Sequence, residues 1–155
     1  MQRTHLPPRF ETLLQTVPYV CMATVCPDGR PWNTPVVVRF DDELTMYWVS
    51  NKESQHSKNL LLTPSLFVIL FDTSVPEGEG SGLYMQLEAK ELHTSADIQC
   101  AQGIYDTSFF VHPPDHEPFR GVCPQRIYQA AVQRLWCNTS YERHGHYIDA
   151  RRSLP

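Results

Sequence analysis

The sequence predicts a mainly β fold, a β-barrel of antiparallel strands with short helices, in a single domain over residues 1–155. About seven segments rich in β-branched and aromatic residues follow one another in meander order. Only two or three short helical patterns interrupt them, whereas a parallel α/β sheet requires strands and helices to alternate. With 41% hydrophobic residues and no internal repeat or linker, the chain can bury one core.

The predicted strands are short and are separated by turn residues. Turns are expected at Pro27-Asp28-Gly29, where the glycine supplies a positive φ, and at Asp41-Asp42-Glu43. In chain order, the strands are expected at residues 19–25, 32–40, 44–50, 65–72, 82–92, 126–137 and 147–150.

Three helices and one long loop complete the prediction. Apolar residues at helical spacing indicate a helix over residues 10–17, which Pro18 ends. Ser54 and Thr94 are expected to cap helices over residues 54–62 and 96–105. The segment 109–124 has four prolines and no period, so we expect a loop or lid that borders the substrate side of a binding site.

Charge and hydropathy exclude several function classes. The net charge of −4 comes without a run of Lys or Arg, so nucleic acid is not an expected partner. No apolar stretch approaches the ~20 residues of a membrane helix, and the first residues have no apolar signal core. A soluble, cytoplasmic protein without a membrane partner is expected.

Cysteines and histidines do not indicate a metal. The five cysteines are an odd number without CxxC spacing, which predicts reduced thiols. His112-Pro113-Pro114-Asp115-His116 and His144-Gly145-His146 contain ligand residue types, but their spacing fits no known ligand frame. We therefore expect surface residues and no metal site.

The segment from Asp28 to Asp72 contains the residues most suited to binding a ligand. It combines a hairpin at Gly29-Arg30-Pro31-Trp32, a strand ending in Tyr47-Trp48-Val49-Ser50, and the polar helix start Ser54-Gln55-His56-Ser57-Lys58. A hydroxyl, an imidazole, an ammonium and free helix N–H groups are thereby expected close together. This combination suits a phosphate monoester.

The order and spacing of these motifs resemble the pyridoxamine 5'-phosphate oxidase family of FMN-binding split barrels. Gly82–Leu92 is similar to the next strand of that family, so the resemblance covers about residues 19–93. It implies that the protein binds FMN and is a homodimer in which each subunit completes the site of the other.

The resemblance also implies a set of site residues. Along the isoalloxazine edge it places Asn33, Thr34, Pro35, Val36, Val37 and Val38, and along the ribityl chain Trp48, Val49 and Ser50. For the phosphate it implies Ser54, His56 and Lys58, and from the partner subunit Gln86 and Trp136. Arg39 falls where the oxidases have a substrate-facing lysine. Trp48 and Trp136 fit core packing as well as flavin contact.

Two functions remain open at this level. The leading hypothesis is an FMN-dependent oxidoreductase acting on a small, flat, unidentified substrate, and the alternative is a flavin-binding carrier, sensor or electron-transfer protein without turnover. Gln55-His56 replaces the basic pair that grips phosphate in the vitamin-forming oxidases. Because this fold also includes haem-degrading and deazaflavin-using members, the cofactor is open too.

Overall fold

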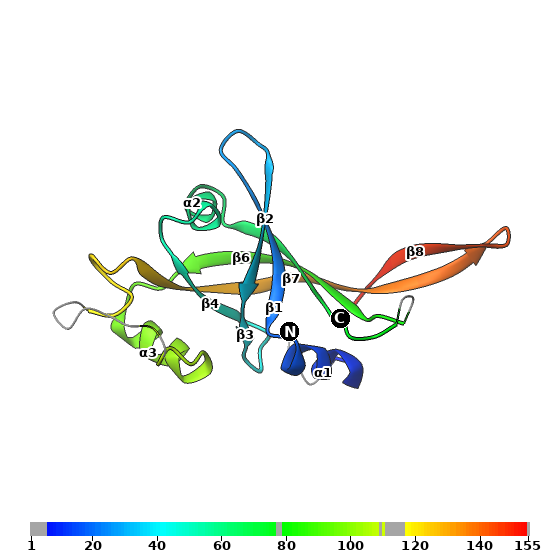
Figure 1. Cartoon of the computed structure of the whole chain (residues 1–155), viewed down its shortest axis with the longest axis horizontal. Helices are drawn as coiled ribbons and strands as arrows, with labels where there is room; N and C mark the ends of the chain where they lie inside the picture. The colour runs from blue at the N-terminus through cyan, green and yellow to red at the C-terminus, as the bar shows by residue number, and fades with distance from the viewer. Residues whose placement is uncertain (1–5, 77–78, 109, 111–116, 155) are drawn as a thin grey trace.

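The computed structural model describes residues 6–76, 79–108, 110 and 117–154. Within these residues it has three helices and eight strands (Figure 1). The helices are α1 (Pro8–Thr16), α2 (Gln55–Leu62) and α3 (Ser95–Ile104). The strands are β1 (Tyr19–Val25), β2 (Pro31–Val37), β3 (Arg39–Phe40), β4 (Met46–Asn51), β5 (Ser65–Phe71), β6 (Gly82–Glu91), β7 (Gln125–Arg143) and β8 (His146–Ser153).

All strands belong to one antiparallel sheet in the order β2-β1-β5-β6-β7-β4-β3, with β8 paired to β7. The strands at the two ends of this order, β2 and β3, are consecutive in the chain and are separated only by Val38. The sheet therefore curls until its two ends are joined by one bent segment. This confirms the predicted antiparallel barrel with short helices.

The predicted strands at 32–40 and 44–50 differ from the observed ones at a bend and a turn. Val38 leaves the sheet ladder, and its N–H donates to the Pro18 carbonyl at 2.9 Å, which divides the first strand into β2 and β3. The second strand begins later than expected because Leu44 has a φ of 63°. The Asp41 carboxylate holds that turn by accepting from the N–H groups of Glu43 and Thr45 at 3.0 and 2.7 Å.

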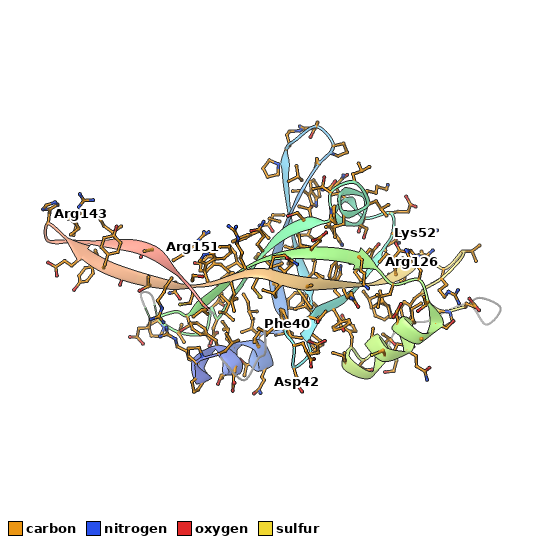
Figure 2. All side chains as sticks on the ribbon, turned by 180° about the vertical axis from the view of Figure 1, so that it is seen from behind. Phe40, Asp42, Lys52, Arg126, Arg143 and Arg151 are labelled. Carbon is orange, nitrogen blue, oxygen red and sulfur yellow. The ribbon has the colours of Figure 1, made fainter. Side chains whose placement is uncertain are left out.

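The C-terminal hairpin is longer than the sequence predicted. The expected strands 126–137 and 147–150 extend into an arm, formed by β7 beyond Cys137 and by β8, that projects from the barrel (Figure 1). His144 and Gly145 both have positive φ, 54° and 78°, as a two-residue hairpin turn of this type requires. His144-Gly145-His146 therefore makes the turn at the end of the arm, where Figure 2 labels Arg143.

The helices lie where they were predicted, but their caps differ. Thr94 caps α3, since its hydroxyl oxygen accepts from the Asp97 N–H at 3.1 Å. Ser54 precedes α2, yet no side-chain hydrogen bond caps that helix in the described structure. No helix in the described part of the chain is long and apolar enough to cross a membrane.

Two apolar clusters hold the fold together. The larger fills the barrel and includes the fully buried Phe10, Met22, Trp48 and Met85. The smaller lies under α3 and comprises Tyr47, Leu92, Ile98, Ala101, Phe119 and Ile127. Burial alternates along β1 and β5, so the outward-facing residues of these strands form a second, half-exposed face.

Candidate functional site

Two rows of paired residues cross the outer face of the sheet. One row runs Pro35, Cys21, Ile69, Tyr84 and Trp136, and the other runs Asn33, Ala23, Phe67, Gln86 and Arg134. Directly paired residues in a sheet point to the same side. Four predicted site residues therefore share one face: Asn33, Pro35, Gln86 and Trp136.

These four residues do not meet within one chain. Asn33 and Gln86 are three strands apart in the sheet order, which corresponds to roughly 14 Å at the usual strand spacing. Pro35 and Trp136 are one strand further apart. A single copy of the chain thus presents two separate halves of the predicted cofactor contact set.

Trp136 belongs to an aromatic cluster on this outer face. Its ring lies 6.1 Å from that of Phe67, centre to centre. The Arg151 guanidinium lies 4.3 Å from the ring centre of Tyr84 and 5.6 Å from that of Phe67. Arg151 comes from β8 at the base of the arm (Figure 2). Trp136 is half-buried, so its side chain still reaches the surface.

Strand β2 is exposed, as expected of the strand at the end of the sheet order. Pro31, Trp32, Asn33 and Pro35 are exposed, and Thr34 and Val37 are half-buried. Val36 and Val38 point into the barrel, so only their backbone groups can contact a ligand. Exposed backbone along β2 suits the polar edge of a flat heterocycle.

A pocket of about 430 Å³ lies between the β1–β2 hairpin and the start of α2. It is lined by Cys26, Pro27, Asp28, Arg30, Pro31, Trp32 and Gln55. The exposed Arg30 guanidinium is paired with Asp28 at 2.6 Å. The pocket joins the accessible backbone of β2 to the first turn of α2.

The start of α2 brings together three predicted residues. His56 Nε2 lies 2.8 Å from Ser50 Oγ and 3.2 Å from Ser54 Oγ. The imidazole is only 7% exposed, and its burial lowers the pKa of His56 below the ordinary value. His56 is therefore a neutral hydrogen-bonding group at the place where the resemblance implies a phosphate contact.

Lys58 does not join this cluster. Its side chain is 51% exposed, and its Nζ lies 3.1 Å from Glu53 Oε2. Since Ser54 does not cap α2, the backbone N–H groups of the first turn are not satisfied by a side chain there. The structure offers hydroxyl and backbone donors for an anion at this point, and places the ammonium elsewhere.

Trp48 and Val49 differ in accessibility. Trp48 is fully buried and stacks on Tyr128 with ring centres 5.2 Å apart. Its side chain serves the core, so a contact with a ribityl chain would involve its backbone. Val49 is half-buried. Trp48 Nε1 has no hydrogen-bond partner among the described residues.

Arg39 is the first residue of β3, directly after the bend at Val38, and is exposed. Its guanidinium donates to the Val38 carbonyl at 2.7 Å and lies 5.8 Å from the ring centre of Tyr105, which follows α3. Burial raises the pKa of Tyr105, and the Arg39 charge opposes that rise. The structure thus places the predicted substrate residue beside α3.

The sequence did not indicate a buried polar group behind α2. Glu91 Oε1 forms an ion pair with Arg126 Nε at 2.9 Å, and the two side chains are only 13% and 9% exposed, respectively. Tyr128 lies beside them and interacts with Ser57. These residues are far apart in the sequence and belong to no short motif. The sequence shows only one sign of the pair, a charged residue in each of two segments that are otherwise typical of β-strands.

The described residues contain no group of three or more His, Cys, Asp or Glu side chains placed to hold a metal ion. His112 and His116, part of the first histidine motif, lie outside the described residues. So do residue 109 and residues 111–116 of the expected loop.

Solved structures with a similar fold include an FMN-binding protein, a haem storage protein and an F420 reductase. A pyridoxamine 5'-phosphate oxidase-related, FMN-binding protein from Nostoc punctiforme is 15% identical, with a TM-score of 0.62 and coverage of 97% of this chain and 98% of that one. The haem storage protein HutZ from Vibrio cholerae is 14% identical, with a TM-score of 0.62 and coverage of 84% and 93%. An F420 reductase is 21% identical, with a TM-score of 0.58 and coverage of 84% and 98%. At such identities the likeness shows the fold.

The family is assigned from the amino-acid sequence, independently of the structure. No curated protein matches this chain. The family model described as pyridoxamine 5'-phosphate oxidase matches residues 6–99, which include α1, β2, β4, α2 and β6. The chain therefore belongs to the pyridoxamine 5'-phosphate oxidase family and has its split-barrel fold.

Proposed function

We propose that this protein is an FMN-dependent oxidoreductase that acts as a homodimer on a small, flat substrate. The observation that supports this most strongly is the continuous path from the exposed strand β2, through the 430 Å³ pocket, to the donor-rich start of α2. A flat ring fits at one end of this path and an anion at the other. Bound FMN would supply hydride exchange, while the protein positions the reactants.

The residues present fit FMN with neutral donors at the phosphate. The first-turn N–H groups of α2 are not capped by a side chain, and Ser50 and Ser54 add hydroxyl groups beside them. A helix N-terminus of this kind favours an anion. His56 supports the two serines, and Lys58 contributes no direct contact.

The homodimer is supported by the outer face of the sheet. That face exposes Phe67, Ile69, Tyr84 and Trp136 in part, and such apolar surface favours burial against a partner. A twofold axis would bring Gln86 and Trp136 of one copy towards Asn33 and Pro35 of the other. This arrangement removes the separation of roughly 14 Å between the two halves of the contact set.

Light scattering tests the dimer. Ile69→Asp places a charge in the middle of the proposed interface and is expected to give monomers, whereas Tyr147→Ser, at an exposed position on the arm, is expected to leave dimers. A monomeric wild-type protein that binds FMN tightly would contradict the shared site.

Substrate binding is proposed at Arg39 and along residues 109–124. Arg39 is exposed near the end of β2, where its guanidinium can orient an anionic group of the substrate. The described end of the loop approaches the cofactor side, because the Pro124 carbonyl accepts from the Lys52 N–H at 2.9 Å. Lys52 immediately follows β4 (Figure 2).

The second candidate is a flavin-binding carrier, sensor or electron-transfer protein without turnover. It is favoured by the buried, neutral state of His56, a titratable group at the proposed phosphate position. Both functions are proposed for the cytoplasm, because none of the five cysteines, all of which lie among the described residues, forms a disulfide, which suits a reducing compartment.

The visible spectrum of the purified protein separates these functions. An enzyme is expected to be yellow with FMN, to bleach when a reduced nicotinamide is added, and to regain its colour in air. A yellow protein that stays oxidised would favour the binding role. A colourless protein that takes up no FMN would contradict both, and titration with haem and a deazaflavin would then identify the cofactor class.

A further inference from the structure

The turn at residues 51–53 connects Ser50, near the end of β4, with Ser54, which precedes α2. Asn51 holds this turn from inside. Its side-chain oxygen accepts from the Glu53 N–H at 2.9 Å, and its carbonyl accepts from the Ser54 N–H at 3.0 Å. The turn is thus fixed within itself, and its placement on the barrel depends on contacts from outside.

An outside contact comes from the segment that precedes β7. The Lys52 N–H donates to the Pro124 carbonyl at 2.9 Å, and Figure 2 labels Lys52 at the same end of the sheet as Arg126. Upstream of Pro124, Phe119 and Gly121 have positive φ, 60° and 54°. A segment with this backbone has no regular ladder, so its carbonyl groups need other donors.

Arg126 supplies those donors. Its guanidinium donates to the carbonyls of Gly121 and Gln125 at 2.7 and 2.9 Å, and also to that of Cys123. Its Nε lies 2.9 Å from Glu91 Oε1, at the end of β6. A planar, forked guanidinium has donors for a carboxylate and several carbonyls at once, whereas a lysine ammonium has its three donors on one atom. Arg126 thus ties the segment before β7 to the end of β6.

Arg120, in the same segment, faces the other way. Its guanidinium donates to Ser95 Oγ at 2.9 Å, at the start of α3, and lies 3.0 Å from the Glu117 carboxylate. Arg126, by contrast, is paired directly with Ser50 between β4 and β7. The segment is therefore held by Arg120 on the side of α3 and by Arg126 on the side of the candidate site.

We propose that Arg126 is a positioning residue for the anion end of the candidate site: it holds Pro124 against Lys52 and so fixes the turn between the two serine hydroxyls. Arg126 is not itself a ligand of the anion, because its side chain is only 9% exposed and its guanidinium already serves Glu91 and three carbonyls. The anion part of this inference rests on the proposed function, whereas the contact between Pro124 and Lys52 does not.

Hydrogen exchange of the protein without added cofactor tests the contact. Arg126→Lys keeps a positive charge beside Glu91 but cannot reach the carbonyls together, so we expect the Lys52 amide to exchange about tenfold faster or more, relative to the core amides of β6. Arg120→Lys is the matched control, and it is expected to leave the Lys52 amide within about twofold of the wild type. If Arg126→Lys does not fold, Glu91→Leu combined with Arg126→Met replaces the buried pair with apolar side chains and carries the test.

Titration with FMN and with riboflavin tests the anion end of the site. In Arg126→Lys we expect FMN binding to weaken about three- to tenfold, roughly the loss of one hydrogen bond, and the binding of riboflavin, which has no phosphate, to change less than about twofold. An unchanged Lys52 amide in the folded variant would overturn the proposal. An FMN affinity that stays unchanged, or that falls equally with that of riboflavin, would overturn its anion part. If wild-type protein binds no FMN, the proposed function fails, while exchange of the Lys52 amide still decides the contact.

Discussion

The two sides of helix α2 differ in role within three consecutive residues. His56 and Ser57 face the interior, where the imidazole is 7% exposed and bonded to two serines. Lys58 faces outward and pairs with Glu53. Residues two apart on a helix are separated by about 200° around its axis, so His56 and Lys58 cannot share one ligand through the same face. The position of a residue around the helix axis, more than its type, decides whether its side chain faces the candidate site.

The largest effect on stability is expected at the buried Glu91–Arg126 ion pair, and the exposed Lys58–Glu53 pair is its control. Glu91→Ala leaves the Arg126 guanidinium buried without its carboxylate, and we expect the free energy of unfolding to fall by about 3–5 kcal/mol. Glu53→Ala removes the exposed partner of Lys58 and is expected to cost less than about 1 kcal/mol. Urea denaturation measures both, and a loss for Glu91→Ala as small as that expected for Glu53→Ala would show that the Glu91–Arg126 pair does not stabilise the fold.

Neighbouring leucines provide a matched comparison of packing. Leu60 is buried against the barrel, whereas Leu61, the next residue, is 69% exposed. We expect Leu60→Ala to lower the free energy of unfolding by about 2–5 kcal/mol, because it leaves a cavity. Leu61→Ala is expected to change it by less than about 0.5 kcal/mol. A large loss for Leu61→Ala in the dimer but not in a monomeric Ile69→Asp background would place α2 at a subunit interface.

FMN binding compares His56 with Lys58, the two residues that the sequence places at the phosphate. His56→Ala removes the group that bonds Ser50 and Ser54, and we expect FMN binding to weaken up to about tenfold. Lys58→Ala is expected to change FMN affinity less than twofold, since the ammonium is paired with Glu53. Fluorescence quenching measures both affinities.

Riboflavin, which has no phosphate, is the control for that experiment. A loss for FMN alone would place the affected group at the phosphate, and an equal loss for both flavins would assign it to the fold or the ring. A strong, FMN-specific loss in Lys58→Ala would contradict the division between the two sides of the helix.

The sequence predicted most of the helices and strands, but it did not predict which polar side chains are buried together near the site. A continuous apolar run predicted β5, an alternating pattern predicted β6, and a β-prone run before a turn motif predicted β1, all within about two residues of the observed bounds. The arm was missed because most of its residues are exposed, which leaves no apolar pattern between Cys137 and Ser153. In the site, the helical period alone separates His56 from Lys58, whereas the Glu91–Arg126 pair joins residues far apart in sequence and depends on the barrel register.

The smallest expected effect is the pH dependence that His56 adds to stability. Its pKa in the folded protein lies below the ordinary 6.5 because burial disfavours the charged imidazole. The unfolded chain therefore takes up this proton first as the pH falls. The stability that depends on neutral His56 is fully present above the unfolded pKa and is lost as the pH falls towards and through the folded value. Thermal unfolding of wild-type protein from about pH 7.5 to about pH 5 should show this loss. His56→Gln keeps a donor but cannot titrate, so its stability should fall less over that range, while Lys58→Met should follow the wild type. If stability falls equally with pH in wild-type protein and His56→Gln, the imidazole is solvated in solution. That result would contradict the placement of His56 on the inward-facing side of α2.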